Sequence, residues 1–168
     1  MAVNLFTFVG MYERIVGTAE HLLAQGAAFA KANGVSEAEM LEWRLIDDMF
    51  PLRNQFQTVV NFPREFAARA AGLELAETMA GESTVAELQA ALAGTKAYLA
   101  ALTPAQFEGR DDVPLTIDLG QMAPTFPTGQ WLTGFATTNL YFHLSTAYGI
   151  LRSRGVQIGK RDLFAGGL

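Results

Sequence analysis

The fold is decided by residues 131–151, which have the sequence WLTGFATTNLYFHLSTAYGIL. No Asp, Glu, Lys or Arg occurs in this stretch, and as a helix it is long enough to span a bilayer. It also carries polar side chains that would be costly against lipid, namely Thr133, Thr137, Thr138, Asn139, His143, Ser145 and Thr146. We therefore predict the most buried helix of a soluble bundle and no membrane span.

Length and composition predict one domain over residues 1–168. Half of the residues are hydrophobic and 17% are charged, which allows a sizeable core. Ala and Leu dominate over the β-branched Val and Ile, a balance that favours helix. The net charge of −5 argues against nucleic acid as a partner, because neutralising phosphates needs a basic surface. Residues 1–12 lack the positive flank of a signal peptide, so we expect a cytoplasmic protein.

Hydrophobic periodicity and capping signals predict four helices. Capping boxes, in which Ser or Thr is followed three residues later by Glu, open the second helix at Ser36 and the third at Thr84. Pro51 and Pro63 are expected to kink or interrupt the second helix. Thr128 can cap the fourth helix, which should end at Gly155. The predicted helices cover residues 4–33, 36–73, 84–102 and 130–154.

Residues 111–127 are the only stretch that alternates like a strand. Leu115, Ile117 and Leu119 recur at every second position, and Gly120 can turn the chain back. Proline on both sides limits this segment to a short, marginal hairpin or an extended loop. The predicted fold is therefore all-α: an antiparallel four-helix bundle with its long connection between the third and fourth helices. The glycine-rich tail after Gly155 is expected to pack across it.

Four polar side chains stand where the predicted helices should face the core: Asp48 and Gln55 on the second helix, Asn139 and His143 on the fourth. An unpaired buried polar group costs about 1–3 kcal/mol, so we expect these side chains to converge. Arg44, one turn before Asp48, can pair with that carboxylate. Asp48, Gln55, Asn139, His143 and Arg44 are therefore the candidate ligand-binding residues.

Three interpretations of this polar cluster stay open: a satisfied structural network, a ligand pocket inside the bundle, or a metal site. The sequence contains no H-E-x-x-H, G-x-S-x-G or G-x-G-x-x-G motif and no cysteine. The other histidine, His21, falls opposite the apolar face of the first helix and is expected to be solvated. A basic cluster near the end of the chain is expected to cap the last helix or to contact an anion; it comprises Arg152, Arg154, Lys160 and Arg161.

The chain resembles an uncharacterised bacterial family of the DinB/YfiT-like superfamily. The segments that carry the resemblance are residues 44–55, 82–88, 139–148 and 155–162. The resemblance implies a four-helix bundle that is often a dimer.

In better-known members of that superfamily, three histidines hold a divalent metal, one from the second helix and two four residues apart on the last. Some of them are thiol-dependent transferases or isomerases. Only His143 matches this pattern here, since Asn139 takes the place of its partner and the second helix offers Asp48 or Gln55. An amide is a poor ligand for zinc or nickel, so we predict no cofactor and no tight transition-metal site.

Two functions are compatible with the sequence. The first is a small-ligand-binding or structural module with a degenerate metal site; the alternative is a metal- or thiol-dependent enzyme, with His143 as general base or metal ligand and Asp48 orienting it. A homodimer is predicted because Trp131, Tyr141 and Tyr148 lie off the face that carries Phe135 and Phe142. Residues 111–127 or the tail are the alternative cover for those aromatic side chains.

Overall fold

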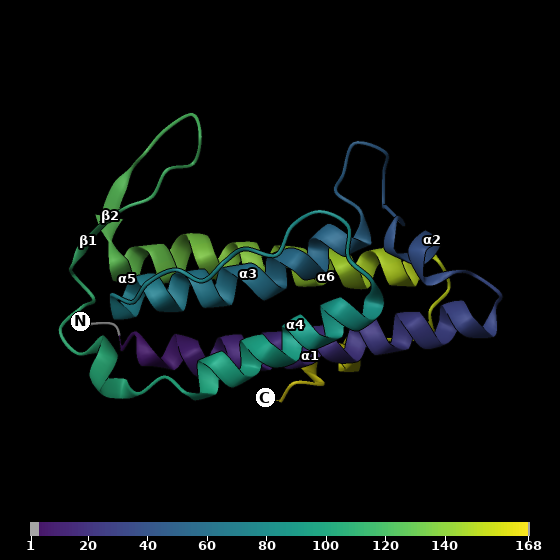
Figure 1. Cartoon of the computed structure of the whole chain (residues 1–168), viewed down its shortest axis with the longest axis horizontal. Helices are drawn as coiled ribbons and strands as arrows, with labels where there is room; N and C mark the ends of the chain where they lie inside the picture. The colour runs from purple at the N-terminus through teal and green to yellow at the C-terminus, as the bar shows by residue number, and fades with distance from the viewer. Residues whose placement is uncertain (1–3, 168) are drawn as a thin grey trace.

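Four long helices make up about half of the chain in the computed structural model, which describes residues 4–167 (Figure 1). They are α1 (Phe6–Ala32), α3 (Leu52–Ala71), α4 (Val85–Ala100) and α6 (Thr137–Ser153). The shorter helical pieces are α2 (Glu37–Leu41), η1 (Pro104–Phe107), α5 (Thr128–Gln130), η2 (Trp131–Ala136) and η3 (Lys160–Phe164). The strands β1 (Pro114–Thr116) and β2 (Thr125–Pro127) form one small antiparallel sheet. The fold is thus mostly helical, as the composition predicts.

The long helices do not alternate in direction along the chain. α1 and α6 run one way, whereas α3 and α4 run the other (Figure 1). Residues 73–83, here called the crossover segment, return along α3 before α4 begins. The Asn61 amide bonds the Met79 backbone at 2.8 and 2.9 Å, and Gln57, one turn earlier on α3, donates to the Gly81 carbonyl at 2.9 Å. The crossover segment therefore joins two parallel helices, α3 and α4, which differs from the predicted antiparallel order. The predicted long connection before the last helix is present as residues 101–127.

The core forms where the apolar faces of the long helices meet. α1 packs against α3, α4 and α6, and its Val16, Leu22 and Leu23 are fully buried. Phe56 of α3 and Leu92 of α4 are equally buried on the facing helices. The bounds of α1 and α4 agree with the predicted helices, and the capping box of Thr84 and Glu87 is present. Hydrophobic spacing was therefore sufficient to place these two helices.

The predicted second helix is two helices separated by a loop. Ser36 caps α2 as expected, accepting a hydrogen bond from the Glu39 backbone, but α2 ends at Leu41 and α3 begins at Leu52. Pro51 occupies the N-cap position with extended backbone, because the helical conformation is disfavoured around proline. Pro63, in contrast, lies within a continuous α3. Residues 42–51 are thus a loop, and Asp48 does not lie on a helix.

The predicted hairpin is present and covers the start of the last helix. Leu115 pairs with Phe126, and Gly120 adopts φ +86° between the strands. The Trp131 indole donates to the Leu115 carbonyl at 2.8 Å and packs edge-on against the Phe126 ring. Trp131 is consequently only 2% exposed.

The last helix begins earlier than predicted and changes its winding. α5, the π-helical η2 and α6 follow without a break, and α6 ends next to Gly155 as expected. Thr128 does not cap it: Pro127 precedes the first turn, and the Thr128 hydroxyl donates to the Val113 carbonyl at 2.9 Å. At the end of η2 the Thr137 hydroxyl donates to the Leu132 carbonyl at 2.7 Å. Among residues 4–167 no helix is both long and apolar enough to cross a membrane.

The C-terminal tail packs on α1, as expected for a glycine-rich segment. Gly166 lies so close to α1 that a Cβ there would come within 1.9 Å of the Arg14 carbonyl oxygen. His21 of α1 contacts the Asp162 carboxylate at 2.6 Å. The prediction of a solvated His21 is therefore wrong, because the tail supplies a partner that helical periodicity does not reveal.

Candidate functional site

Two of the predicted site residues meet directly between α3 and α6. Gln55, on the first turn of α3, is 1% exposed, and its Oε1 lies 2.7 Å from Nδ1 of His143 on α6. The Gln55 Nε2 donates to the Phe50 carbonyl at 2.8 Å. The amide thereby connects the end of the loop, α3 and α6, and the His143 ring is held from one side.

These contacts determine the tautomer of His143. The Phe50 carbonyl can only accept a hydrogen bond, so the Gln55 nitrogen must face it and the Gln55 oxygen must face the ring. Nδ1 of His143 therefore carries a proton and donates. In the neutral imidazole the lone pair is then on Nε2, which can accept a hydrogen bond, take a proton or bind a metal.

Burial keeps this imidazole neutral at physiological pH. Desolvation of the half-buried ring lowers the pKa of His143 below its ordinary value of 6.5. No carboxylate bonds the ring among the described residues, and the Phe142 ring packs edge-on against it with centroids 5.2 Å apart. The site thus presents a neutral basic nitrogen beside an aromatic side chain.

Asn139 shares this side of α6 without joining the pair. It lies one turn before His143 and is half-buried, as predicted. Its Nδ2 donates to the Phe135 carbonyl of its own helical segment at 2.8 Å. Asn139 therefore lies next to the Gln55–His143 pair but binds backbone.

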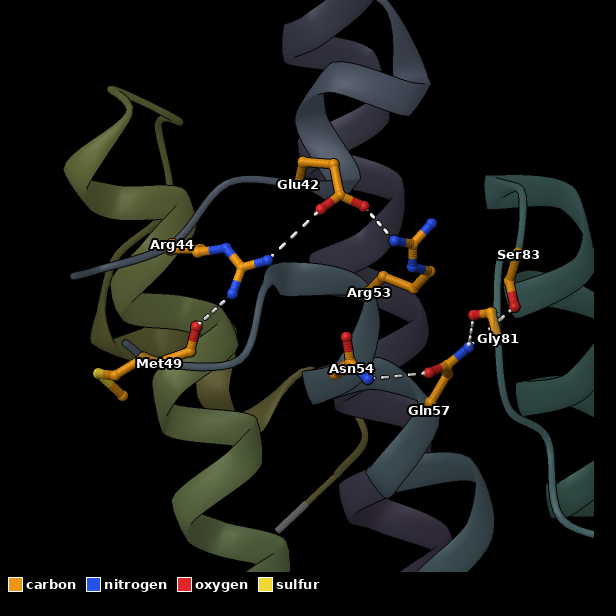
Figure 2. A network of polar contacts seen from close by, with 8 residues as sticks. All are labelled: Glu42, Arg44, Met49, Arg53, Asn54, Gln57, Gly81 and Ser83. Carbon is orange, nitrogen blue, oxygen red and sulfur yellow. Dashed lines mark hydrogen bonds and ion pairs between the residues drawn. The ribbon is translucent and has the colours of Figure 1, made fainter. Parts of the chain in front are cut away.

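Asp48 and Arg44 lie in the loop, and the predicted ion pair between them is wrong. Asp48 is exposed. Arg44 donates to the Met49 carbonyl at 2.7 Å and lies 3.7 Å from the Glu42 carboxylate (Figure 2). Because Pro51 ends the helical conformation before α3, the one-turn spacing of Arg44 and Asp48 no longer brings them together. Gln55 takes the role of orienting His143 that was predicted for Asp48.

A polar network that sequence reasoning missed fastens the loop and the crossover segment to α3. Glu42 lies between Arg44 and Arg53 and forms an ion pair with each of them (Figure 2). One turn after Arg53 on α3, the buried Gln57 donates to the Gly81 carbonyl and to the Ser83 hydroxyl, each at 2.9 Å. Gln57 follows Gln55 by two residues on a largely buried helix. Two glutamines this close together in such a helix were the one sequence feature that could have predicted the network.

Large apolar side chains are exposed around the loop and α6. Leu45 lies over Gly149 of α6. A Cβ added to Gly149 would be 3.6 Å from Cδ1 of Leu45, which is ordinary van der Waals contact. Gly149 follows Phe142 by two helical turns and shares its face. We call the following residues the apolar patch, with their exposed fractions: Leu45 (47%), Ile46 (61%), Phe50 (65%), Tyr141 (48%) and Phe142 (54%).

The residues present do not fit the three-histidine metal site of the superfamily. Within residues 4–167 no group of three or more His, Cys, Asp and Glu side chains is arranged to hold a metal ion. Nδ1 of His143 is committed to Gln55, which leaves one imidazole nitrogen, and Asn139 offers only an amide oxygen. The prediction that the protein lacks a tight transition-metal site remains for elemental analysis to test.

The basic residues near the end of α6 have contacts of their own. Arg152 donates to the Val156 carbonyl at 3.3 Å, and the Arg154 guanidinium lies over the Trp43 ring at 5.6 Å. These contacts fit the expected role at the helix end.

Comparison with known proteins finds one family and a similar solved structure. The family described as "Domain of unknown function (DUF1993)" matches residues 6–164. No curated protein matches the chain. The chain is similar to the crystal structure of a DinB family member protein from Shewanella denitrificans, with 30% identity, a TM-score of 0.86, and coverage of 95% of this chain and 90% of that one. The similarity includes the elements that carry Gln55 and His143.

Proposed function

We propose that this chain, which belongs to the DUF1993 family of domains of unknown function and is DinB-like, is a small-ligand-binding module that works as a homodimer. We infer that residues 1–168 form one domain, because α1 contacts the other three long helices and the tail. The ligand class is a small neutral molecule with one hydrogen-bond donor and an apolar body.

The fixed tautomer of His143 carries the proposal. Its Nε2 is an acceptor in a ring that Gln55 orients and that burial keeps neutral. Such a nitrogen selects a hydroxyl or N–H donor over an anion, because a neutral imidazole with its lone pair on Nε2 has nothing to donate there. Phe142 and Phe50 supply exposed apolar surface close to the pair for the rest of the ligand.

Imidazole NMR tests this proposal directly. The chain contains two histidines, so His143→Asn identifies the His143 nitrogen signals and His21 serves as an internal reference. Screening a library of small neutral alcohols and amides should find compounds that shift His143 Nε2 while leaving His21 unchanged. Binding of those compounds should be lost in His143→Leu and retained in His21→Leu. A screen with no compound that acts on His143 Nε2 would refute the binding function.

The apolar patch supports the homodimer. Trp131, one of the aromatic residues that motivated the prediction, is covered by the hairpin, and Tyr148 is half-buried. Tyr141 and Phe142 remain exposed, and so do Leu45, Ile46 and Phe50 of the loop. Contiguous exposed apolar residues are typical of subunit interfaces, and two-fold pairing covers them in one step.

Light scattering of the intact protein at micromolar concentration tests the dimer. A mass near twice 18.2 kDa is expected for the wild type and for Met122→Ser, which removes an equally exposed side chain from the hairpin. The double variant Ile46→Ser/Phe142→Ser should shift towards 18.2 kDa. A wild-type mass of one chain would show that the patch has another purpose.

An enzyme is the second candidate, favoured by the same histidine. A neutral imidazole with a free Nε2 lone pair at pH 7 is a competent general base. Because the chain has no cysteine, any thiol chemistry would need a thiol co-substrate. Turnover of a ligand from the NMR screen that follows the deprotonation of His143, and that His143→Asn abolishes, would establish this alternative.

A further inference from the structure

A second polar site lies on the other side of α3, beneath the crossover segment. Arg64 follows Gln55 by nine residues, about two and a half turns, and so projects from the opposite face of the helix. The crossover segment leaves a pocket on each side, one of about 550 Å³ towards α4 and one of about 210 Å³ along α3. Arg64, Glu77 and Thr78 line both of them.

Arg64 has no partner for its charge in the described chain. None of the ion pairs within 4.0 Å among residues 4–167 includes it, whereas the neighbouring Arg69 pairs with Glu65 at 2.9 Å. Its Nε is buried without a hydrogen-bond partner. Leaving a buried donor of a charged group unsatisfied costs at least about 1–3 kcal/mol, so this arginine lowers stability unless something binds it.

Tyr98 of α4 holds the guanidinium and is itself unsatisfied. The Arg64 Cζ lies over the Tyr98 ring at 5.9 Å from its centroid, in a cation–π contact. The Tyr98 hydroxyl is buried with no hydrogen-bond partner. Burial raises the pKa of Tyr98, although the charge of Arg64 opposes this rise, so the phenol stays protonated and able to donate. Two neighbouring side chains thus offer donors that nothing in the described chain accepts.

The mouth of the larger pocket is acidic. Glu77, Glu82 and Glu87 line it together with Arg64, and none of the three forms an ion pair among the residues described. Glu87 accepts hydrogen bonds from Thr84, so Glu77 and Glu82 are the carboxylates without a partner in the described chain. A pocket lined by one arginine and three carboxylates, none of them in an ion pair within residues 4–167, repels polyanions. It matches a small molecule that carries a carboxylate at one end and an ammonium group close to it.

We propose that the pocket between the crossover segment and α4 binds a free amino acid, with its carboxylate on Arg64 and its ammonium group at Glu77 and Glu82. The planar guanidinium accepts a carboxylate in a bidentate geometry, and Tyr98 keeps it in position. The crossover segment holds the acidic rim over Arg64, because Asn61 fixes the backbone at Met79 and Gln57 fixes it at Gly81.

Isothermal titration calorimetry of the full chain with each of the twenty common L-amino acids tests the site. At least one should bind, and its affinity should fall roughly 10- to 100-fold in Arg64→Met, since bonds to charged groups are each worth about 1.5–3 kcal/mol. Arg69→Met removes the same charge from the next turn and should bind as the wild type does. The matching carboxylic acid without the amine should bind at least about tenfold more weakly.

Three results would overturn the proposal: no amino acid binds at millimolar concentration, Arg64→Met binds as well as the wild type, or the amine-free acid binds equally well. Urea unfolding adds a readout that keeps the test valid for a structural arginine. Arg64→Met should leave the ligand-free protein as stable as the wild type or more stable, whereas a structural Arg64 would make it clearly less stable. His143→Leu should not change amino-acid binding, so this site and the proposed His143 site are tested separately.

Discussion

The substitution Gln55→Glu should reverse the direction in which the pKa of His143 is shifted. A carboxylate oxygen would replace the amide oxygen that now lies 2.7 Å from Nδ1. A negative charge at hydrogen-bond distance raises a histidine pKa by about 1–3 units, against the lowering that burial causes in the wild type. Each unit corresponds to about 1.4 kcal/mol between the two protonation states. The expected change therefore favours the imidazolium by about 1.4–4 kcal/mol.

The contribution of His143 to stability should depend on pH in opposite directions in the wild type and in Gln55→Glu. In the wild type the folded pKa of His143 lies below the unfolded value, so stability is complete above about pH 6.5 and falls as the pH drops towards the folded pKa. In Gln55→Glu the folded pKa lies above the unfolded value, so the contribution of the ion pair is complete below about pH 6.5 and disappears as the pH rises. The variant also loses the bond to the Phe50 carbonyl, at a cost of about 1–3 kcal/mol at every pH. It should be clearly less stable than the wild type in alkali and approach it near pH 5–6.

Imidazole NMR and urea unfolding, both measured from pH 5 to 9, test this prediction. Gln55→Met is the matched control, because it keeps the side-chain length without a charge or a hydrogen bond and should leave the pKa of His143 lowered. His21 reports any general effect of the substitution. A His143 pKa in Gln55→Glu that is no higher than in the wild type would mean that residue 55 does not hold the ring, and the assignment of the tautomer would fail with it.

Other predictions concern the tail and the core. Gly166→Ala places a Cβ within 1.9 Å of the Arg14 carbonyl and should lower the free energy of unfolding by about 1–3 kcal/mol in a urea titration; an unchanged midpoint would mean that the tail does not dock. Asp162→Asn should destabilise the protein at neutral pH and make no difference well below pH 4, because the Gly159 N–H and then His21 lower the pKa of this carboxyl; a pH-independent effect would contradict this origin. Leu92→Ala should cost about 2–5 kcal/mol by chemical denaturation, and a loss below about 1 kcal/mol would place Leu92 outside the core.

Gln55 and His143 were two of the four polar residues that the sequence predicted to converge, and the structure brings these two together. Both are polar residues on the apolar face of a helix, and apolar residues of the same helix follow each of them at helical spacing. Burial then leaves them few partners other than each other. The same argument correctly places Asn139 on that side of α6, but it does not predict that its amide would bind the Phe135 carbonyl, because a local backbone acceptor is available on any helix.

Asp48 fails the same argument because helical spacing continues by coincidence through a segment that is not helical. Leu41, Leu45 and Leu52 recur at intervals that suit a helix, yet the chain leaves the helix after Leu41. The loop is closed by a hydrogen bond from the Leu52 N–H to the Trp43 carbonyl at 2.8 Å, and such backbone pairing has no signature in side-chain pattern. Pro51 is the one local signal, and it marks where α3 starts without showing how far back the loop extends.

The parallel arrangement of α3 and α4 was also beyond the reach of the sequence. The crossover segment is held by Asn61 and Gln57, whose amides bond backbone groups of Met79 and Gly81. Backbone groups are the same at every residue, so the sequence of the crossover segment does not show which residues these amides bind. The direction of the segment could therefore not be predicted. A connection of this length permits both a return along the helix and a short turn to an antiparallel neighbour.

The two candidate sites differ in how their side chains affect the stability of the ligand-free protein, and this difference can be measured without any ligand. In the Gln55–His143 pair the Gln55 oxygen and nitrogen and His143 Nδ1 all have partners, so this contact contributes to folding whether or not a ligand is bound. At Arg64 and Tyr98, buried donors lack partners, so these side chains are unfavourable for folding in the absence of a ligand. Substituting Gln55 should therefore lower stability, whereas substituting Arg64 should not. If Arg64 can be removed without loss of stability although it lines a pocket, its presence there is explained by what it binds.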